Sequence, residues 1–228
     1  KTVFSQRDTC LLHGVTSSGK TAVYIELIKN TLAEGKQVLY LLPEIALTTQ
    51  LMQRLGRVFG DKMGVYHSKF PDNERVETWL RQLSSEPFPL ILGVRSALLL
   101  PFQNLGLIIV DEEHEASYKQ QDPAPRYHAR DTALVLAQRC GAKVLLGTAT
   151  PAVETYYNVQ KGKFGLVEMH QRFGDLQMPQ ILVEDVGELR RKKLMKTPFA
   201  PRLIDEMARA IERREQVILF QNRRGYAP

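Results

Sequence analysis

The chain has 228 residues, of which 43% are hydrophobic and 25% are charged, as in ordinary folded proteins. This composition excludes wholesale disorder, and no apolar run approaches the ~18–20 residues that a membrane-spanning helix needs. The net charge is +6, and the whole excess of Lys and Arg lies in residues 115–228, so either a polyanionic partner or a solvated basic surface is expected there. The two cysteines, Cys10 and Cys140, lie too far apart in sequence for a metal-ligand motif and fit a reducing compartment.

Short apolar runs alternate with helical patterns through residues 1–172, which is typical of parallel βαβ units. The runs that we expect to form strands are 10–13, 38–42, 63–67, 90–94, 107–110 and 143–147. Helices are expected over 20–33, from Leu47 to Gly60, and after Asp72, which is predicted to be an N-cap. The last of these helices carries an apolar stripe that we expect to face the core, formed by Val76, Trp79, Leu80 and Leu83. The whole pattern predicts a doubly wound α/β domain with a mainly parallel sheet flanked by helices.

The pattern changes after residue 172. The elements expected there are a linker over 171–179, strands over 181–185 and 217–220, and a helix over 198–214. In that helix Ile204, Met207 and Ile211 are expected to point inward. A strand, a helix and a strand are too few for an independent core. We therefore predict a first domain over 1–172 and, over 173–228, a linker with the incomplete beginning of a second domain.

A phosphate-binding motif follows the first expected strand and opens the first expected helix. Its eight residues match the P-loop pattern G-x-x-x-x-G-K-[ST] and are Gly14, Val15, Thr16, Ser17, Ser18, Gly19, Lys20 and Thr21. In this context the backbone N–H groups would surround phosphates at a helix N-terminus. Lys20 is predicted to reach the β- and γ-phosphates, and the Thr21 hydroxyl is predicted to bind Mg²⁺. The alternative is an ordinary turn rich in Ser and Gly.

An acidic cluster directly follows the apolar run 107–110. Asp111 is predicted to hold Mg²⁺, and Glu112 is predicted to position or deprotonate the attacking water, as in a Walker B motif. Carboxyl ends of parallel strands share one edge of a sheet, so this motif and the P-loop can meet at one nucleotide. His114 continues the cluster and is a candidate for sensing the state of the nucleotide. The alternative is a polar loop with a chance group of acids.

A third motif, Gly-Thr-Ala-Thr-Pro, follows the expected strand 143–147. Small hydroxyl side chains at a strand end can bridge to groups on neighbouring strands. Thr148 and Thr150 are therefore candidates for coupling the ATP site to neighbouring strands of the domain. The alternative for Thr150 is a helix N-cap with Pro151 as the first helical residue.

These three motifs, in this order and at strand ends, resemble those of superfamily 2 helicases. Residues 42–48 look like motif Ia, and residues 93–98 look like motif Ib. The run DEEHEASYKQQ from Asp111, its continuation through RYHARD, and the final QNRRGYAP are similar to the bacterial primosomal helicases that restart replication forks. The resemblance covers nearly the whole chain.

The resemblance implies an ATP-dependent 3′→5′ DNA helicase with Mg²⁺ as its metal ion. It implies two RecA-like P-loop NTPase lobes, of which this chain holds the first and the truncated start of the second. Branched and single-stranded DNA, primosome proteins and single-strand-binding proteins are the implied partners, in the bacterial cytoplasm at the nucleoid. Residues 117–127 resemble an aromatic-rich loop that links DNA contact to ATP hydrolysis, with Tyr118 and Tyr127 offering stacking faces. The residues implied to contact DNA are Pro43, Thr48, Arg95, Ser96, Tyr118, Lys119, Arg126, Tyr127 and Arg224.

The chain also departs from the family pattern. Ser17 stands where the family often has glycine, which a negative φ would accommodate. The family's N-terminal DNA-binding region, its zinc-binding cysteines and its arginine finger are not in the chain, so we expect weak ATP binding and very slow hydrolysis without unwinding. Three alternatives stay open: another superfamily 2 translocase of repair or restriction, a nucleotide-binding module without turnover, and a P-loop kinase.

Overall fold

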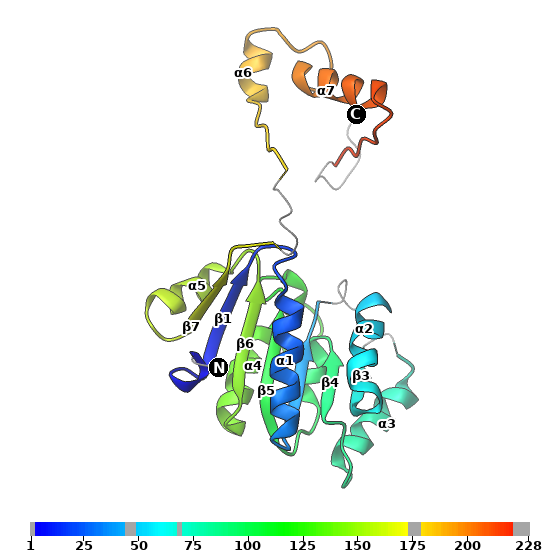
Figure 1. The fold of residues 1–228 in the computed structure, drawn as a ribbon, viewed down its shortest axis with the longest axis vertical. Helices are drawn as coiled ribbons and strands as arrows, with labels where there is room; N and C mark the ends of the chain where they lie inside the picture. The colour runs from blue at the N-terminus through cyan, green and yellow to red at the C-terminus, as the bar shows by residue number, and fades with distance from the viewer. Residues whose placement is uncertain (1–2, 44–48, 68–69, 173–178, 221–228) are drawn as a thin grey trace. The chain divides into compact units, whose positions relative to one another are not determined.

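The computed structural model describes residues 3–43, 49–67, 70–172 and 179–220 of the chain (Figure 1). It divides into two compact units, Lys1–Leu176 and Gln177–Pro228. The expectations for Leu47, Thr48 and Arg224 fall outside the described residues.

The larger unit is built on a parallel sheet in the order β3-β4-β2-β5-β6-β1-β7. Its strands are β1 (Thr9–Gly14), β2 (Gln37–Leu41), β3 (Met63–Tyr66), β4 (Leu90–Gly93), β5 (Leu105–Asp111), β6 (Lys143–Thr148) and β7 (Gly165–Met169). The six expected strands are confirmed. The seventh, β7, was not expected, because this edge strand is only half-buried and lacks the continuous apolar run of the central strands.

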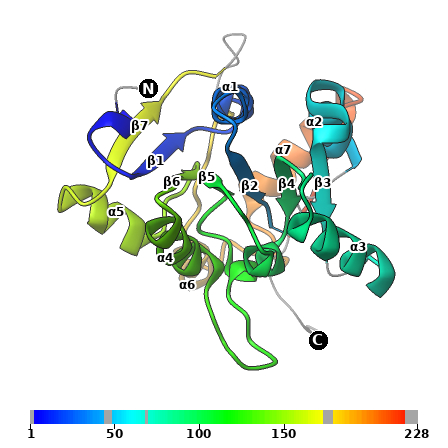
Figure 2. The ribbon, with the colours of Figure 1, turned by 90° about the horizontal axis from the view of Figure 1, so that it is seen from below.

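Helices cover both faces of this sheet (Figure 2). The helices are α1 (Lys20–Ala33), α2 (Thr49–Phe59), α3 (Asp72–Leu83), α4 (Ala129–Cys140) and α5 (Val153–Gln160), with short 3₁₀ turns η1 (Val3–Ser5), η2 (Gly60–Lys62), η3 (Arg95–Leu99) and η4 (Ala116–Tyr118). One core lies between the sheet and α1 and α2, where Tyr24, Ile28 and Leu55 are fully buried. A second core lies on the opposite face against α4, whose small residues Ala133 and Ala137 allow close packing.

The register of the central strands brings the motifs to one edge of the sheet. Strand β6 lies between β5 and β1, with Gly147 opposite both Asp111 and Leu12. Thr148 likewise lies opposite His13, one residue before the P-loop glycine. The P-loop, the acidic cluster and the Gly-Thr-Ala-Thr-Pro motif therefore leave the sheet side by side.

The apolar stripe of α3 does not face the core, so that prediction is wrong. Val76, Trp79, Leu80 and Leu83 are 55%, 40%, 59% and 58% exposed. The helix instead turns Gln82 inward, where it is fully buried and its Oε1 accepts a hydrogen bond from Gln37 Nε2 at 3.2 Å. Asp72 is the first helical residue rather than the N-cap. A polar anchor, and not the amphipathic pattern, thus sets the rotation of this helix.

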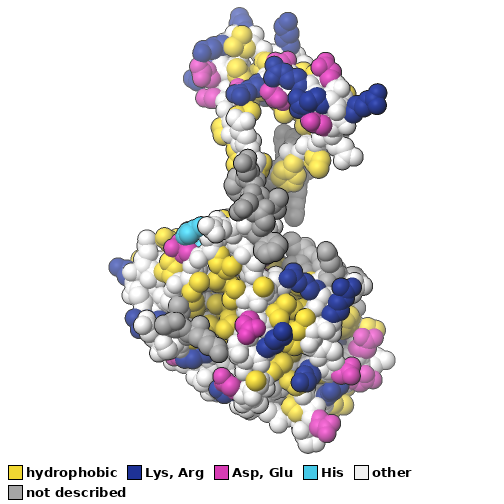
Figure 3. Space-filling view, in the orientation of Figure 1, with side chains coloured by type: hydrophobic (Ala, Val, Ile, Leu, Met, Phe, Trp, Pro, Cys, Tyr) yellow, Lys and Arg dark blue, Asp and Glu magenta, His cyan; other side chains and the backbone are white. Residues whose placement is uncertain are grey.

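The smaller unit carries α6 (Val186–Arg191) and α7 (Pro201–Glu212), with acidic and basic side chains interleaved over its surface (Figure 3). The expected strands over 181–185 and 217–220 are wrong, because no hydrogen-bonded partner strand lies beside them among the described residues. The inward orientation of Ile204 and Ile211 is also wrong, because these side chains are 39% and 63% exposed. Ala200 is the one apolar residue described as buried in this unit.

Two substitutions in the isolated chain distinguish the exposed stripe from the core. We expect Leu80→Gln to change the free energy of unfolding by less than ~0.5 kcal/mol, because the side chain is already in water. Leu92→Ala, in the fully buried strand β4, is expected to cost about 2–5 kcal/mol through lost contacts and a cavity. Urea unfolding followed by circular dichroism measures both. Equal costs would show that the stripe is packed.

Candidate nucleotide-binding site

The P-loop forms a concave turn between β1 and α1. Gly19 is the N-cap of α1, with φ of +90°, and as a glycine it has no side chain to cap the helix. Ser17 also has a positive φ, +64°, so the condition under which serine would be accommodated without strain is not met, and a non-glycine residue occupies the left-handed region. Successive turns of this kind direct backbone N–H groups into a hollow that suits an anion.

Lys20 crosses this hollow from the first turn of α1. Its Nζ donates to Gly14 O at 2.8 Å and lies 4.0 Å from Glu112 Oε1. A side chain at Gly14 would displace its neighbours, since a Cβ would lie 2.7 Å from Ser18 Oγ. That Oγ is buried without a hydrogen-bond partner among the described residues, as expected of a group whose partner is a bound ligand.

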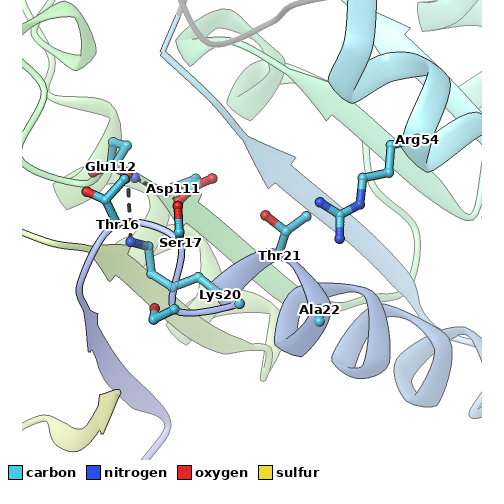
Figure 4. Close-up of a pocket in the computed structure, with 10 residues that line it drawn as sticks. Thr16, Ser17, Lys20, Thr21, Ala22, Arg54, Asp111 and Glu112 are labelled. Carbon is cyan, nitrogen blue, oxygen red and sulfur yellow. Dashed lines mark hydrogen bonds and ion pairs between the residues drawn. The ribbon is translucent and has the colours of Figure 1, made fainter. Parts of the chain in front are cut away.

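A cavity of about 530 Å³ opens over the loop (Figure 4). It is lined by Thr16, Ser17, Ser18, Gly19, Lys20, Thr21, Ala22, Arg54, Asp111 and Glu112. The donor set fits a nucleotide phosphate with Mg²⁺: an ammonium and N–H groups for the phosphate, and hydroxyl and carboxylate oxygens for the metal. Arg54, which α2 directs toward the cavity beside Thr21, was not expected, because a lone arginine on the polar face of a helix has no sequence signature.

The carboxylate of Asp111 is held by two tyrosine hydroxyls. Tyr24 donates to Oδ1 at 2.9 Å, and Tyr40 donates to Oδ2 at 3.1 Å. Burial raises the pKa of Asp111 above its ordinary value of 3.8, the Tyr24 hydrogen bond opposes that shift, and the charge of Glu112 adds to it. Burial, followed by the charge of Asp111, raises the pKa of both tyrosines well above 10.0, so both remain donors.

Glu112 has a strained backbone, with φ of +47°. Its backbone N–H donates to Asp111 Oδ1 at 3.1 Å, and its Oε2 lies 3.7 Å from His114 Nδ1. The side chain is 37% exposed, so its carboxylate borders the cavity while remaining in reach of water. This is the placement that a residue orienting an attacking water requires.

The three predicted coupling residues form one connected group. His114 Nδ1 lies 2.7 Å from Thr148 Oγ1, and Thr150 Oγ1 lies 3.4 Å from His114 Nε2. Thr150 N also donates to Thr148 Oγ1 at 3.0 Å. The alternative in which Thr150 caps a helix is wrong, because α5 begins at Val153 with Ala152 as its N-cap.

The predicted DNA-contact residues do not all reach the surface. Tyr118 is 1% exposed and its hydroxyl donates to Asp111 O at 2.7 Å, so this ring offers no stacking face and that prediction is corrected. Pro43 is buried at the end of the β2 segment, and Ser96 is half-buried. Arg95 Nη1 donates to Ser117 O at 3.0 Å, which joins the segment like motif Ib to the loop after the acidic cluster.

The rest of that loop is exposed or half-buried. Tyr127 is half-buried and its hydroxyl donates to Arg95 O at 3.4 Å. Lys119 is also half-buried and donates to the carbonyl of the exposed Arg126. These three side chains keep the charge and the ring that nucleic-acid contact needs.

Within the described residues, His, Cys, Asp and Glu side chains form no group of three or more that could hold a metal ion. No helix in the described part of the chain is long and apolar enough to span a membrane.

The sheet, the P-loop and the acidic strand end define a class of protein. The family model for "DEAD/DEAH box helicase" matches residues 1–159, and the chain belongs to this family, whose members use ATP with Mg²⁺. Among individual proteins, it is 41% identical over 217 residues to the replication restart protein PriA of Bacillus subtilis, covering 95% of this chain and 27% of that protein. The corresponding protein of Haemophilus influenzae is 44% identical over 218 residues, covering 96% of this chain and 29% of that protein. The chain thus spans less than a third of these relatives, and the resemblance drawn from its motifs is confirmed.

Solved structures show the same fold. The helicase domain of Pyrococcus furiosus Hef has a TM-score of 0.54 at 18% identity, covering 76% of this chain and 37% of that one. The structure of RecG bound to a three-way DNA junction has a TM-score of 0.54 at 16% identity, covering 90% of this chain and 28% of that one. The larger unit is therefore a RecA-like α/β domain, as predicted.

Neutralising Asp111 is expected to stabilise the fold in the absence of nucleotide. Because burial places the pKa of Asp111 above 3.8, ionisation makes the folded state less stable relative to the unfolded state. Asp111→Asn in the isolated chain should therefore unfold at a higher temperature than wild type at pH 7 without nucleotide. The difference should shrink as the pH falls and vanish below about pH 3, where the carboxyl is protonated in both states.

Thermal unfolding between pH 3 and pH 8 measures this difference, with Asp61→Asn at an exposed site as the control. A lower melting temperature for Asp111→Asn at pH 7 would show that the ionised carboxylate stabilises the fold.

Gly147 is expected to tolerate no side chain, because a Cβ there would lie 1.8 Å from the hydroxyl oxygen of Tyr24. Gly147→Ala should cost about 1–3 kcal/mol in the free energy of unfolding, since the fully buried ring has to move. Adding Tyr24→Phe removes the nearest atom, so the double variant should be more stable than the two single costs imply. Urea unfolding of the three variants measures the coupling, and additive costs would contradict this contact.

Proposed function

We propose that this chain is the ATP-binding lobe of an ATP-dependent 3′→5′ DNA helicase that acts in replication-fork restart and primosome assembly. The observation that carries the proposal is the single cavity that Lys20, Thr21, Asp111 and Glu112 share. The identity of 41–44% to replication restart proteins over most of the chain supports the choice of process. The proposal concerns the whole protein, because the relatives that match this chain are much longer than it is.

ATP is the substrate, and the residues of the cavity divide its binding among them. The P-loop N–H groups and Lys20 hold the phosphates, and Arg54 adds a second positive charge at the opposite wall. The Thr21 hydroxyl and the Asp111 carboxylate hold Mg²⁺, which when bound neutralises charge on the phosphates. The two tyrosine hydroxyls fix the Asp111 carboxylate before the metal arrives.

Glu112 orients the attacking water or accepts its proton. Its carboxylate lies between Lys20 on one side and His114 on the other, so both neighbours hold it near the phosphate end of the cavity. The hydrogen-bonded group of His114, Thr148 and Thr150 then connects the position of Glu112 to the edge of the sheet. A change at the nucleotide can reach other parts of the protein through this group.

Single-stranded and branched DNA is the proposed second substrate, with primosome and single-strand-binding proteins as partners in the bacterial cytoplasm at the nucleoid. The residues proposed to contact DNA are Pro43, Thr48, Arg95, Ser96, Lys119, Arg126, Tyr127 and Arg224. The exposed Arg126 and the half-buried Lys119 and Tyr127 support this role best, because a ring and two cations suit a strand without sequence preference. The second unit is proposed to be the linker and the start of the second helicase lobe. The complete second lobe is proposed to supply an arginine finger to the ATP site.

The experiment is an ATPase assay of the natural full-length protein with and without single-stranded DNA. We expect DNA to stimulate turnover, and Glu112→Gln to lower kcat by about 10²–10⁴-fold because the group that handles the water is lost. Glu115→Gln, in the same loop, is the matched control and should retain turnover. The isolated chain should be slower than the full-length protein by about 10³–10⁵-fold, because the arginine finger is proposed to come from the second helicase lobe.

Turnover that does not depend on DNA would favour a P-loop kinase or another nucleotide-binding protein. Unchanged turnover in Glu112→Gln would overturn the role of that residue.

A further inference from the structure

Glu113 is a fully buried carboxylate that the ATP site does not use. It lies between Glu112 and His114, yet its side chain points away from the cavity and is 0% exposed. Three donors satisfy it: Ala152 N at 2.7 Å, Thr155 Oγ1 at 2.8 Å and Arg130 Nη1 at 3.1 Å. The first two belong to the beginning of α5, and the third belongs to the beginning of α4. One side chain therefore joins the acidic cluster to two helices.

The loop over residues 119–127 ends just before Arg130. Lys119 and His128 form an antiparallel bridge across its base, and Gln120 N donates to Tyr127 O at 2.9 Å. Gln120 Nε2 also donates to the carbonyls of Pro123 and Pro125. Figure 2 shows this loop projecting from the sheet between β5 and α4, and residues 121–126 are exposed. Its internal bonds favour movement of the loop as one piece.

Both ends of this loop are tied to the acidic cluster. At the near end, Tyr118 donates to Asp111 O at 2.7 Å, while Arg95 holds Ser117 O. At the far end, Arg130 binds Glu113. A displacement of the loop must therefore move residues 111–113 or break these contacts. Breaking the far contact leaves a buried charge without its partner, which is the more costly outcome.

We propose that Glu113 is the positioning residue through which contact of loop 119–127 with DNA changes the rate of ATP hydrolysis. The inference rests on the proposed function, since it explains how that function is regulated. When the loop moves, Arg130 shifts and Glu113 shifts with it. The same displacement reaches Glu112 through one peptide bond and the region of Thr148 and Thr150 through Ala152 N.

The structure supplies matched controls for this role. Arg130 also pairs with Asp131 at 2.9 Å and with Glu154 at 3.9 Å, and those two side chains are 59% and 74% exposed. Exposed pairs contribute little and are screened by solvent. Glu154→Gln and Asp131→Asn therefore change the same arginine without touching the buried contact.

The test measures kcat and KM for ATP in the natural full-length protein, without DNA and with saturating single-stranded DNA. We expect Glu113→Gln to keep kcat without DNA within about threefold of wild type, and to lower the stimulation by DNA at least about tenfold. Thr155→Val, which removes one donor at nearly constant shape, should lower the stimulation by a smaller factor. Glu154→Gln and Asp131→Asn should retain it.

A double variant keeps the test decisive if Glu113→Gln alone does not fold. Glu113→Gln with Arg130→Gln removes both charges, so no buried charge is left unpaired, and we expect it to fold while remaining insensitive to DNA. Equal losses of kcat with and without DNA, retained stimulation in a folded variant, or an equal loss in Glu154→Gln would each overturn the inference. A wild-type protein that DNA does not stimulate would overturn the proposed function, and this inference with it.

Discussion

The carboxylate of Asp111 is half-buried at the wall of the nucleotide cavity, and the arrangement of the larger unit follows from that constraint. A charged group in such a place must receive hydrogen bonds, or its ionised form is strongly disfavoured. The donors come from α1 and β2, through Tyr24 and Tyr40, so these two elements are fixed relative to the end of β5. The helix that begins with the P-loop is thus held by the same group that is proposed to bind the metal ion. The packing of α1 and β2 and the proposed metal binding therefore depend on the same hydrogen bonds from Tyr24 and Tyr40 to Asp111.

The order of the strands adds a second restriction. Strand β6 passes between β5 and β1, and at Gly147 it leaves just enough space for the Tyr24 hydroxyl to reach Asp111. The residue that follows, Thr148, then lies beside His114. Gly147 belongs to the Gly-Thr-Ala-Thr-Pro motif in the sequence, but the structure requires a glycine there because the Tyr24 side chain of α1 occupies the adjacent space.

Sequence patterns predicted the layout of the larger unit and less of its detail. The bounds of α1 and the positions of six strands were predicted because periodicity and strand-end motifs are local properties. The pattern shows that a helix has an apolar face, but it does not show what covers that face, which is why the stripe of α3 was misassigned. Tyr118 was misassigned for a related reason, since a tyrosine in a polar loop can still turn its ring inward. Arg54 and the partners of Glu113 depend on contacts between distant segments, which no local pattern encodes.

Two residues beside the nucleotide cavity, Ser17 and Glu112, hold left-handed backbone conformations that glycine would adopt more readily. The two positions differ in what a glycine would do. At position 17 the side chain has no assigned chemistry, so a glycine would keep the anion-binding turn and remove its strain. At position 112 a glycine would relax the turn and delete the carboxylate that is proposed to orient the attacking water. The turn at position 17 is therefore compatible with either serine or glycine, whereas at position 112 the backbone strain cannot be relieved by glycine without losing the proposed catalytic carboxylate.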